Sequence, residues 1–186
     1  YTMIFLILEL LILILLLIVI FWLICLIFAQ IFGAPTVYSS KKAVIDTLKL
    51  ADLKKDELLI DLGCGNARVL ILAAKEFGAR GIGVDRSPYC FLKSKLNVLL
   101  SGQKGKIRII FGNFEKAENY LPKADAVYLY LLNSANIKIE NWLFKNISNK
   151  TKIVSLAFTF SKHMPKKSIF TKTLGQKTQA SLYIKG

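Results

Sequence analysis

The chain has 186 residues, 54% of them hydrophobic, and a formal net charge of +14. That length suits one domain with an accessory segment, while the hydrophobic content is high for a wholly soluble protein. The three cysteines lack the CxxC or CxxH spacing of metal-binding motifs. Their spacing argues against a disulfide framework, predicts no metal site and fits a reducing compartment.

An uninterrupted apolar run of 19 residues extends from Leu10 to Phe28, and Glu9 is the only charge between Met3 and Phe32. As a helix, this run spans roughly 28 Å, close to the thickness of the hydrocarbon core of a bilayer. The alternative is a cleaved signal peptide, which has a basic first region, a shorter apolar core and a small-residue cleavage site. The sequence shows none of these features, so we expect a retained transmembrane anchor over residues 1–32.

Charge is confined to the remainder of the chain. All 26 lysines and arginines and 11 of the 12 acids follow position 40, which gives that part a net charge of +15. Because basic flanks stay in the cytoplasm during insertion, Lys41 and Lys42 predict a single-pass membrane protein with a cytoplasmic domain. Two explanations of the basic character stay open: attraction to anionic lipid or nucleic acid, and biased codon use in the genome.

After the turn at residues 33–35 (GAP), apolar patterns predict strands that alternate with helices. We expect a linker with a helix over 33–57 and a doubly wound, mostly parallel seven-stranded α/β domain over 58–186 that ends in a hairpin. The expected helices are 41–53, 67–77, 88–100 and 136–146, and the expected strands are 58–62, 81–85, 107–111, 124–132, 152–160, 168–174 and 180–184.

A glycine-rich loop, residues 61–65 (DLGCG), follows the first predicted strand. Gly63 and Gly65 let the backbone turn sharply and approach a ligand, and the next helix presents free N–H groups to it. Asp85 ends the second strand, where a carboxylate can accept both hydroxyls of a ribose. Both features lie at the carboxyl ends of parallel strands, where open sheets bind ligands.

Two nucleoside cofactors compete for this pattern. A nicotinamide dinucleotide requires glycine or alanine where this chain has Arg68, and Asp61 adds negative charge where its pyrophosphate would lie. S-adenosylmethionine instead carries a sulfonium and an amino group, which an acid attracts. The spacing therefore predicts S-adenosyl-L-methionine as cofactor, and the alternative is a structural glycine turn in an α/β protein of other function.

Residues 61–65 together with 83–85 (GVD) resemble the seven-β-strand, Rossmann-like methyltransferases that use S-adenosylmethionine. The runs 33–35, 125–132 (DAVYLYLL) and 154–158 (VSLAF) resemble more narrowly the lysine methyltransferases of mitochondrial adenine nucleotide translocase and ATP synthase subunit c, and their prokaryotic relatives. Those proteins also carry one hydrophobic anchor ahead of the domain. The resemblance covers essentially the whole chain.

The resemblance implies roles for individual residues. Asp61 and Gly63 would border the methionine part of the cofactor, and Asp85 would hold the ribose. Asn113 would lie beside the adenine, where members usually have Asp, and its amide oxygen can still accept a hydrogen bond. Asn133 stands just past the fourth strand, at the target pocket, where relatives often have Pro.

The end of the fourth strand also bears on the acceptor. Methyltransferases for adenine or glutamine amides typically carry a Pro-Pro loop there, whereas this chain has 131–134 (LLNS), which disfavours nucleic acid as the acceptor. Tyr128 and Tyr130 share one sheet face, where they either pack in the core or form an aromatic wall for a lysine ammonium or the sulfonium. We take Tyr130 and Asn133 as the catalytic candidates, and expect the lone His163 to be solvated.

The resulting hypothesis is an enzyme that methylates a lysine of a membrane-associated protein. One alternative is a methyltransferase for a small-molecule or lipid-linked acceptor. The other is a catalytically idle module that binds the cofactor or docks a partner at the membrane.

Overall fold

The structure is a computed structural model that describes residues 2–32, 39–173 and 175–185, and the chain divides into two compact units, Tyr1–Pro35 and Thr36–Gly186. The first unit contains helix α1 (Thr2–Phe32). Its stretch Met3–Ile27 is long and apolar enough to cross a membrane, a property that an N-terminal signal sequence shares. Nearly all apolar side chains of this stretch are exposed.

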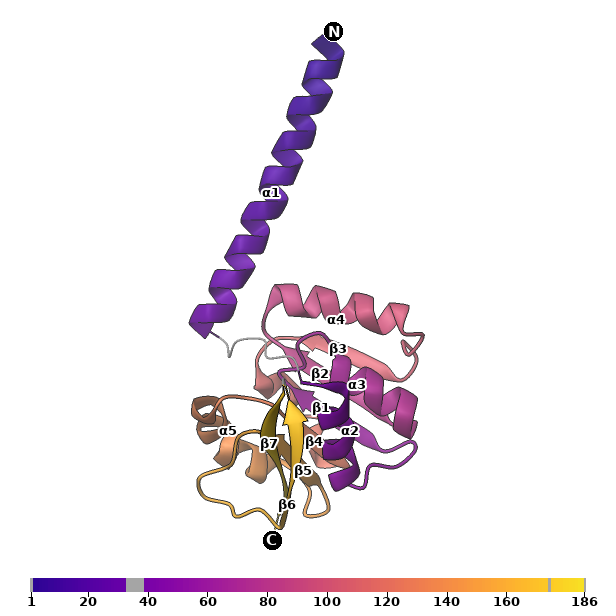
Figure 1. The fold of residues 1–186 in the computed structure, drawn as a ribbon, viewed down its shortest axis with the longest axis vertical. Helices are drawn as coiled ribbons and strands as arrows, with labels where there is room; N and C mark the ends of the chain where they lie inside the picture. The colour runs from indigo at the N-terminus through magenta and orange to yellow at the C-terminus, as the bar shows by residue number, and fades with distance from the viewer. Residues whose placement is uncertain (1, 33–38, 174, 186) are drawn as a thin grey trace. The chain divides into compact units, whose positions relative to one another are not determined.

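The second unit is built on one seven-stranded sheet with the order β3-β2-β1-β4-β5-β7-β6 (Figure 1). Strands β1 to β5 are parallel, and β7 is antiparallel to both β5 and β6. The strands are β1 Leu58–Leu62, β2 Arg80–Asp85, β3 Ile107–Phe111, β4 Ala126–Leu129, β5 Lys152–Leu156, β6 Lys167–Thr173 and β7 Gln176–Ile184. The expected doubly wound fold is confirmed, and the strand order reverses between β1 and β4, where such sheets bind ligands.

Helices cover both faces of the sheet. One apolar cluster joins α2, α3 and α4 to one face, and the other joins α5 and two short 3-10 helices to the opposite face. The helices are α2 Lys41–Leu50, α3 Arg68–Leu72 with a π-helical continuation Ala73–Phe77, α4 Pro88–Leu100, α5 Asn133–Asn146, and the 3-10 helices Phe114–Ala117 and Leu121–Lys123.

Local sequence explains where two of these helices begin. The Ser40 hydroxyl accepts a hydrogen bond from the backbone N–H of Ala43 at 3.1 Å, and the Ser87 hydroxyl accepts from that of Cys90 at 3.3 Å. These caps satisfy N–H groups that a helix start leaves without partners. Pro88 occupies the first turn of α4, where its missing N–H costs nothing.

Several expected boundaries were wrong. Strand β4 ends at Leu129 rather than 132, and α5 begins at Asn133, three residues before the expected start. Strand β5 ends at Leu156 rather than 160, because Ala157 has φ 69°, which no strand accommodates. Helix α2 ends at Leu50, and the hairpin is tighter than expected, since β7 already begins at Gln176; position 174 lies outside the described residues.

Candidate active site

The predicted site residues gather at the carboxyl ends of β1, β2, β3 and β4. Because β1 lies between β2 and β4 in the sheet, the loop after β1 is flanked by the ends of both neighbours. Within β1, Asp61 is in register with Gly83 of β2 and with Tyr128 of β4. The topology therefore brings residues separated by up to 67 positions to one edge of the sheet.

The glycine loop after β1 passes very close to its surroundings. Gly63 has φ 83°, and a Cβ added there would come within 2.8 Å of a methyl carbon of Leu131. The backbone N–H groups of Gly63 and Cys64 both donate to the carbonyl of Val84, at 2.9 and 3.1 Å. The loop is thus bound to the end of β2, and a side chain at position 63 would strain the backbone and displace the Leu131 methyl group.

One backbone feature of this loop was not apparent from the sequence. Ala67, immediately before α3, has φ 62°, in the left-handed region that glycine normally occupies. A non-glycine residue there costs about 1 kcal/mol. The sequence gives no signal for this strain, because alanine at that position reads simply as the start of a helix.

Asp85 connects the glycine loop to the start of α4. Its Oδ2 accepts a hydrogen bond from the Gly65 N–H at 2.8 Å, and its Oδ1 accepts from the Ser87 N–H at 2.9 Å. Burial raises the pKa of this carboxyl above its usual value, and the two backbone donors oppose that rise. Each carboxylate oxygen keeps a further lone pair, so the side chain can still accept hydrogen bonds from a ligand.

Asp61 is buried in a different electrostatic setting. Its side chain is 3% exposed, and among the described residues its Oδ2 has no hydrogen-bond partner. Burial, and then the charge of Asp85, raise its pKa to about 8. The neighbouring Tyr128 hydroxyl is also buried, and its pKa is raised by burial and by the charge of Asp61. A buried carboxyl without a cation is costly, so this corner of the site favours a positively charged ligand.

The acceptor candidates lie at the end of β4. Tyr130 is half-buried, which raises its pKa, and its ring lies 6.3 Å, centroid to centroid, from that of Phe158 in the loop after β5. Asn133 is exposed in the first turn of α5. Sequence analysis did not identify Phe158 as a site residue, because its loop was expected to be part of a strand.

Asn113 lies on the other side of the glycine loop. It is exposed, directly before the 3-10 helix Phe114–Ala117, and its side chain does not cap that helix. The preceding Gly112 donates its N–H to the backbone carbonyl of Asp85 at 3.0 Å. This bond holds the loop after β3 against the end of β2, so Asn113 and Asp85 belong to the same corner.

His163 is not simply solvated as expected. Its ring stacks on Phe144 with centroids 3.5 Å apart, and its Nδ1 lies 2.9 Å from Oε1 of Glu140. Glu140 is 1% exposed and also accepts from the backbone N–H groups of Ser161, Lys162 and His163 and from the Ser161 hydroxyl. These bonds outweigh the effect of burial and lower the pKa of Glu140 to about 2. Sequence analysis missed Glu140, because its partners lie more than 20 positions away.

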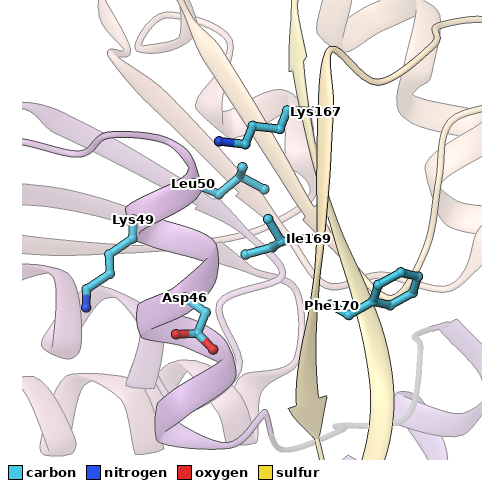
Figure 2. Close-up of a pocket in the computed structure, with 6 residues that line it drawn as sticks. All are labelled: Asp46, Lys49, Leu50, Lys167, Ile169 and Phe170. Carbon is cyan, nitrogen blue, oxygen red and sulfur yellow. The ribbon is translucent and has the colours of Figure 1, made fainter.

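A separate open pocket of about 420 Å³ lies between α2 and β6 (Figure 2). Asp46, whose carboxylate accepts from Lys42 Nζ and the Thr171 hydroxyl, contributes to its wall. Its other lining residues are Lys49, Leu50, Lys167, Ile169 and Phe170. It contains none of the predicted cofactor or acceptor residues, so we do not assign the chemistry to it.

Comparisons with known proteins agree with this geometry. The profile of the ANTKMT methyltransferase domain matches residues 61–167. A protein-lysine N-methyltransferase of Saccharolobus islandicus is 29% identical over 153 residues, which cover 82% of this chain and 94% of that protein. The crystal structure of an RNA methyltransferase from Salinibacter ruber, in complex with S-adenosyl-L-homocysteine, is 31% identical and covers 78% of this chain and 93% of that one, with a TM-score of 0.70.

A more distant structure is that of precorrin-6y C5,15-methyltransferase from Geobacter metallireducens. It is 15% identical with a TM-score of 0.65, and the match covers 81% of this chain and 92% of that one. This likeness supports the fold alone. The profile match begins at the buried carboxylate Asp61 and includes the glycine loop, Asp85 and the ends of β3 and β4. The chain is therefore an S-adenosylmethionine-dependent methyltransferase with a Rossmann-like seven-stranded fold, and it belongs to the ANTKMT methyltransferase domain family.

Proposed function

We propose that this enzyme methylates the side-chain amino group of a lysine in a membrane-associated protein. The observation that carries the proposal is the aromatic pair Tyr130 and Phe158 at the end of β4 and β5, on the same edge of the sheet as Asp61. Aromatic faces attract a cationic or amine-bearing side chain by cation–π interaction. The relative from Saccharolobus islandicus, which the chain spans almost completely, is a protein-lysine N-methyltransferase.

The residues of the first corner fit the cofactor. The unpaired, buried oxygen of Asp61 suits the amino group of S-adenosylmethionine, because a cation there removes the cost of the isolated carboxylate. Gly63 and Gly65 leave room for close approach of the backbone. The remaining lone pairs of Asp85 suit the ribose hydroxyls, and the exposed amide oxygen of Asn113 suits the adenine amino group.

When bound, S-adenosylmethionine supplies an electrophilic methyl group on a sulfonium. The chain's own contribution is positioning: Tyr130 and Phe158 confine the acceptor side chain, and Asn133, at the start of α5, borders its entrance. The lysine Nζ must give up a proton to solvent before it can attack, and removal of the side chain from water lowers its pKa because desolvation disfavours the charged form. Alignment of the nucleophile supplies much of the rate enhancement, so no dedicated general base is required.

Helix α1 provides the proposed link to the membrane. We propose that residues 1–32 anchor the chain, that 33–57 link the anchor to the methyltransferase domain at 58–186, and that this domain faces the cytoplasm. Only eight positions separate Phe32 at the end of α1 from Lys41 at the start of α2. Even fully extended, such a segment reaches at most about 29 Å, so the tether concentrates membrane-borne acceptors around the site.

A radiolabel experiment separates this proposal from its alternatives. The full chain in vesicles is incubated with tritiated S-adenosylmethionine and a membrane extract, and protein, RNA and lipid fractions are counted. We expect label in methyl-lysine of membrane proteins, and much less of it with the Asp61→Asn variant at a subsaturating cofactor concentration. RNA is the second candidate, since the 31%-identical relative is an RNA methyltransferase. Label confined to RNA, lipids or small molecules would overturn the lysine assignment.

A further inference from the structure

The outer face of α4 carries a stripe of exposed leucines. Leu92, Leu96, Leu99 and Leu100 are between 55% and 75% exposed. Their spacing of four, three and one positions places them on one side of the helix. The opposite side packs into the domain through Cys90, Ser94 and Val98. Helix α4 thus carries apolar side chains on two faces, and the domain covers only one of them among the described residues.

This leucine stripe lies within a basic stretch of the sequence. Between positions 86 and 114 the sequence contains no acid, and its six basic residues are Arg86, Lys93, Lys95, Lys104, Lys106 and Arg108. Lys93 and Lys95 flank the stripe on either side, with Lys93 Nζ near the Tyr89 hydroxyl and Lys95 Nζ over the Phe91 ring. Lys104 and Lys106 are exposed just beyond the helix end.

We propose that the leucine stripe of α4 docks on the surface of an anionic bilayer. Exposed leucines at helical spacing can bury in the boundary between headgroups and acyl chains, roughly 5–10 Å deep, while flanking lysines reach the lipid phosphates. A symmetric dimer through the same stripe would bring Lys93 and Lys95 of the two copies close together, and these like charges repel each other. Charge complementarity therefore favours lipid over a second copy.

Docking through α4 would fix the orientation of the active site. The helix is joined to the cofactor corner at its start, where Asp85 accepts from the Ser87 N–H. It is joined again in its third turn, where Asn97 Nδ2 donates to the carbonyl of Asn66, directly after the glycine loop, at 3.0 Å. This inference rests on the membrane anchor of the proposed function and adds a second contact, so the domain would hold its site at a set height above the bilayer.

The test is a fluorescence measurement on the full chain in vesicles of phosphatidylcholine with phosphatidylserine. An environment-sensitive dye is attached at Leu96→Cys and, as matched control, at Lys145→Cys, which is exposed on α5. The native cysteines are buried, and the labelled parent protein measures their background. We expect a nitroxide-bearing lipid to quench the dye at position 96 several-fold more strongly than at 145. Omitting phosphatidylserine should reduce the difference.

Equal quenching at the two positions would overturn the proposal. So would a dye at 96 that neither lipid-borne nor water-soluble quenchers reach, with a dimeric chain in centrifugation, because a second copy would then cover the stripe. A triple variant, Leu92→Ser, Leu96→Ser and Leu99→Ser, should keep the melting temperature and lose methylation of membrane acceptors. If the parent methylates no lysine but the dye is quenched, the proposed acceptor fails and the docking inference stands.

Discussion

Two buried acids on opposite sides of the sheet behave in opposite ways. Asp61 and Glu140 are 3% and 1% exposed, yet the pKa of Asp61 is raised to about 8 and that of Glu140 is lowered to about 2. Glu140 accepts bonds from three consecutive backbone N–H groups, a hydroxyl and a histidine, whereas one Asp61 oxygen has no partner among the described residues. Asp61 lies deeper in the domain and beside the charge of Asp85, while Glu140 has hydrogen-bond donors that offset its burial.

The difference separates a structural acid from a ligand-binding one. Glu140 already has the partners that a buried carboxylate needs. Its hydrogen bonds to residues 161–163 hold the loop after β5 against α5. Asp61 Oδ2 has no such partner among the described residues, which is why we propose its region as the cofactor corner. A substitution in one region should therefore leave the function of the other region unchanged.

The largest effect is expected at Asp85, which joins the glycine loop to α4 and borders Asp61. Asp85→Ala should weaken binding of S-adenosylhomocysteine by about 2–4 kcal/mol, roughly 30- to 900-fold, because charge-assisted hydrogen bonds are lost. Calorimetry measures the affinity, and circular dichroism checks that the domain stays folded. A Kd within about threefold of the parent would rule out this role, because that is under 1 kcal/mol.

Asp61→Asn should separate stability from binding. The folded pKa of Asp61 lies above its unfolded value of 3.8, so the parent without cofactor loses stability as the pH rises from about 4 to about 8. The Asn variant should lack this loss and melt higher at pH 8, while cofactor affinity falls by about 1.5–3 kcal/mol. Melting curves at pH 5 and pH 8 decide; an equal pH dependence in both proteins would contradict the unpaired-acid account.

Glu140→Gln should lower the stability of the domain and leave cofactor binding unchanged. Amide nitrogen in place of one oxygen leaves donors such as the Ser161 N–H unpaired, at a cost of about 1.5–3 kcal/mol in the free energy of unfolding. The folded pKa of Glu140 is depressed, so the parent loses this contribution as the pH falls from 4.5 toward 2. Urea titration measures the loss. A cofactor Kd that also changes more than twofold would break the separation between the two regions.

Tyr130→Ala should reduce acceptor recognition without altering cofactor binding. Loss of a cation–π contact of about 1–2 kcal/mol predicts a KM for a lysine acceptor roughly 5- to 30-fold higher. Tyr130→Phe keeps the ring and serves as the control, with a KM close to that of the parent. If Tyr130→Ala leaves the KM unchanged, the ring packs in the core and does not contact the acceptor.

The smallest effect is expected at Ala67, in the glycine loop. Ala67→Gly should raise the free energy of unfolding by about 0.5–1 kcal/mol, because glycine adopts φ 62° without strain. Thermal unfolding measures it. A lower melting temperature would mean that the methyl group, which is fully buried, contributes more through packing than the backbone loses.

The two sides of the site differ in how far the sequence predicts them. The common location of Asp61, Gly63, Gly65 and Asp85 was predictable, because they form a short motif at strand ends that periodicity alone locates. Their role in cofactor binding stays a prediction. The ends of β4 at Leu129 and of β5 at Leu156, on the acceptor side, were not predictable from the sequence pattern. Asn133 starts a helix that no polar cap announces, and Ala157 adopts a left-handed conformation.

The long-range partners were also beyond the sequence. Nothing near Glu140 indicates that it meets the backbone of residues 161–163, and nothing near Phe158 indicates that it meets Tyr130. Such pairs depend on the side-by-side placement of β4 and β5 and on the loop that leaves β5. The exposed face of α4 was predictable in part. Its leucine spacing is visible in the sequence, but only the fold shows which face the domain covers.

The central claim, methylation of a lysine on a membrane protein, is tested most directly in cells. Mass spectrometry compares methyl-lysine on membrane proteins between cells that carry the parent gene and cells that carry the Asp85→Ala variant at equal protein level. We predict at least one membrane-protein lysine that is methylated with the parent and unmodified with the variant. Identical methyl-lysine profiles, or a difference confined to RNA or lipid, would contradict the account.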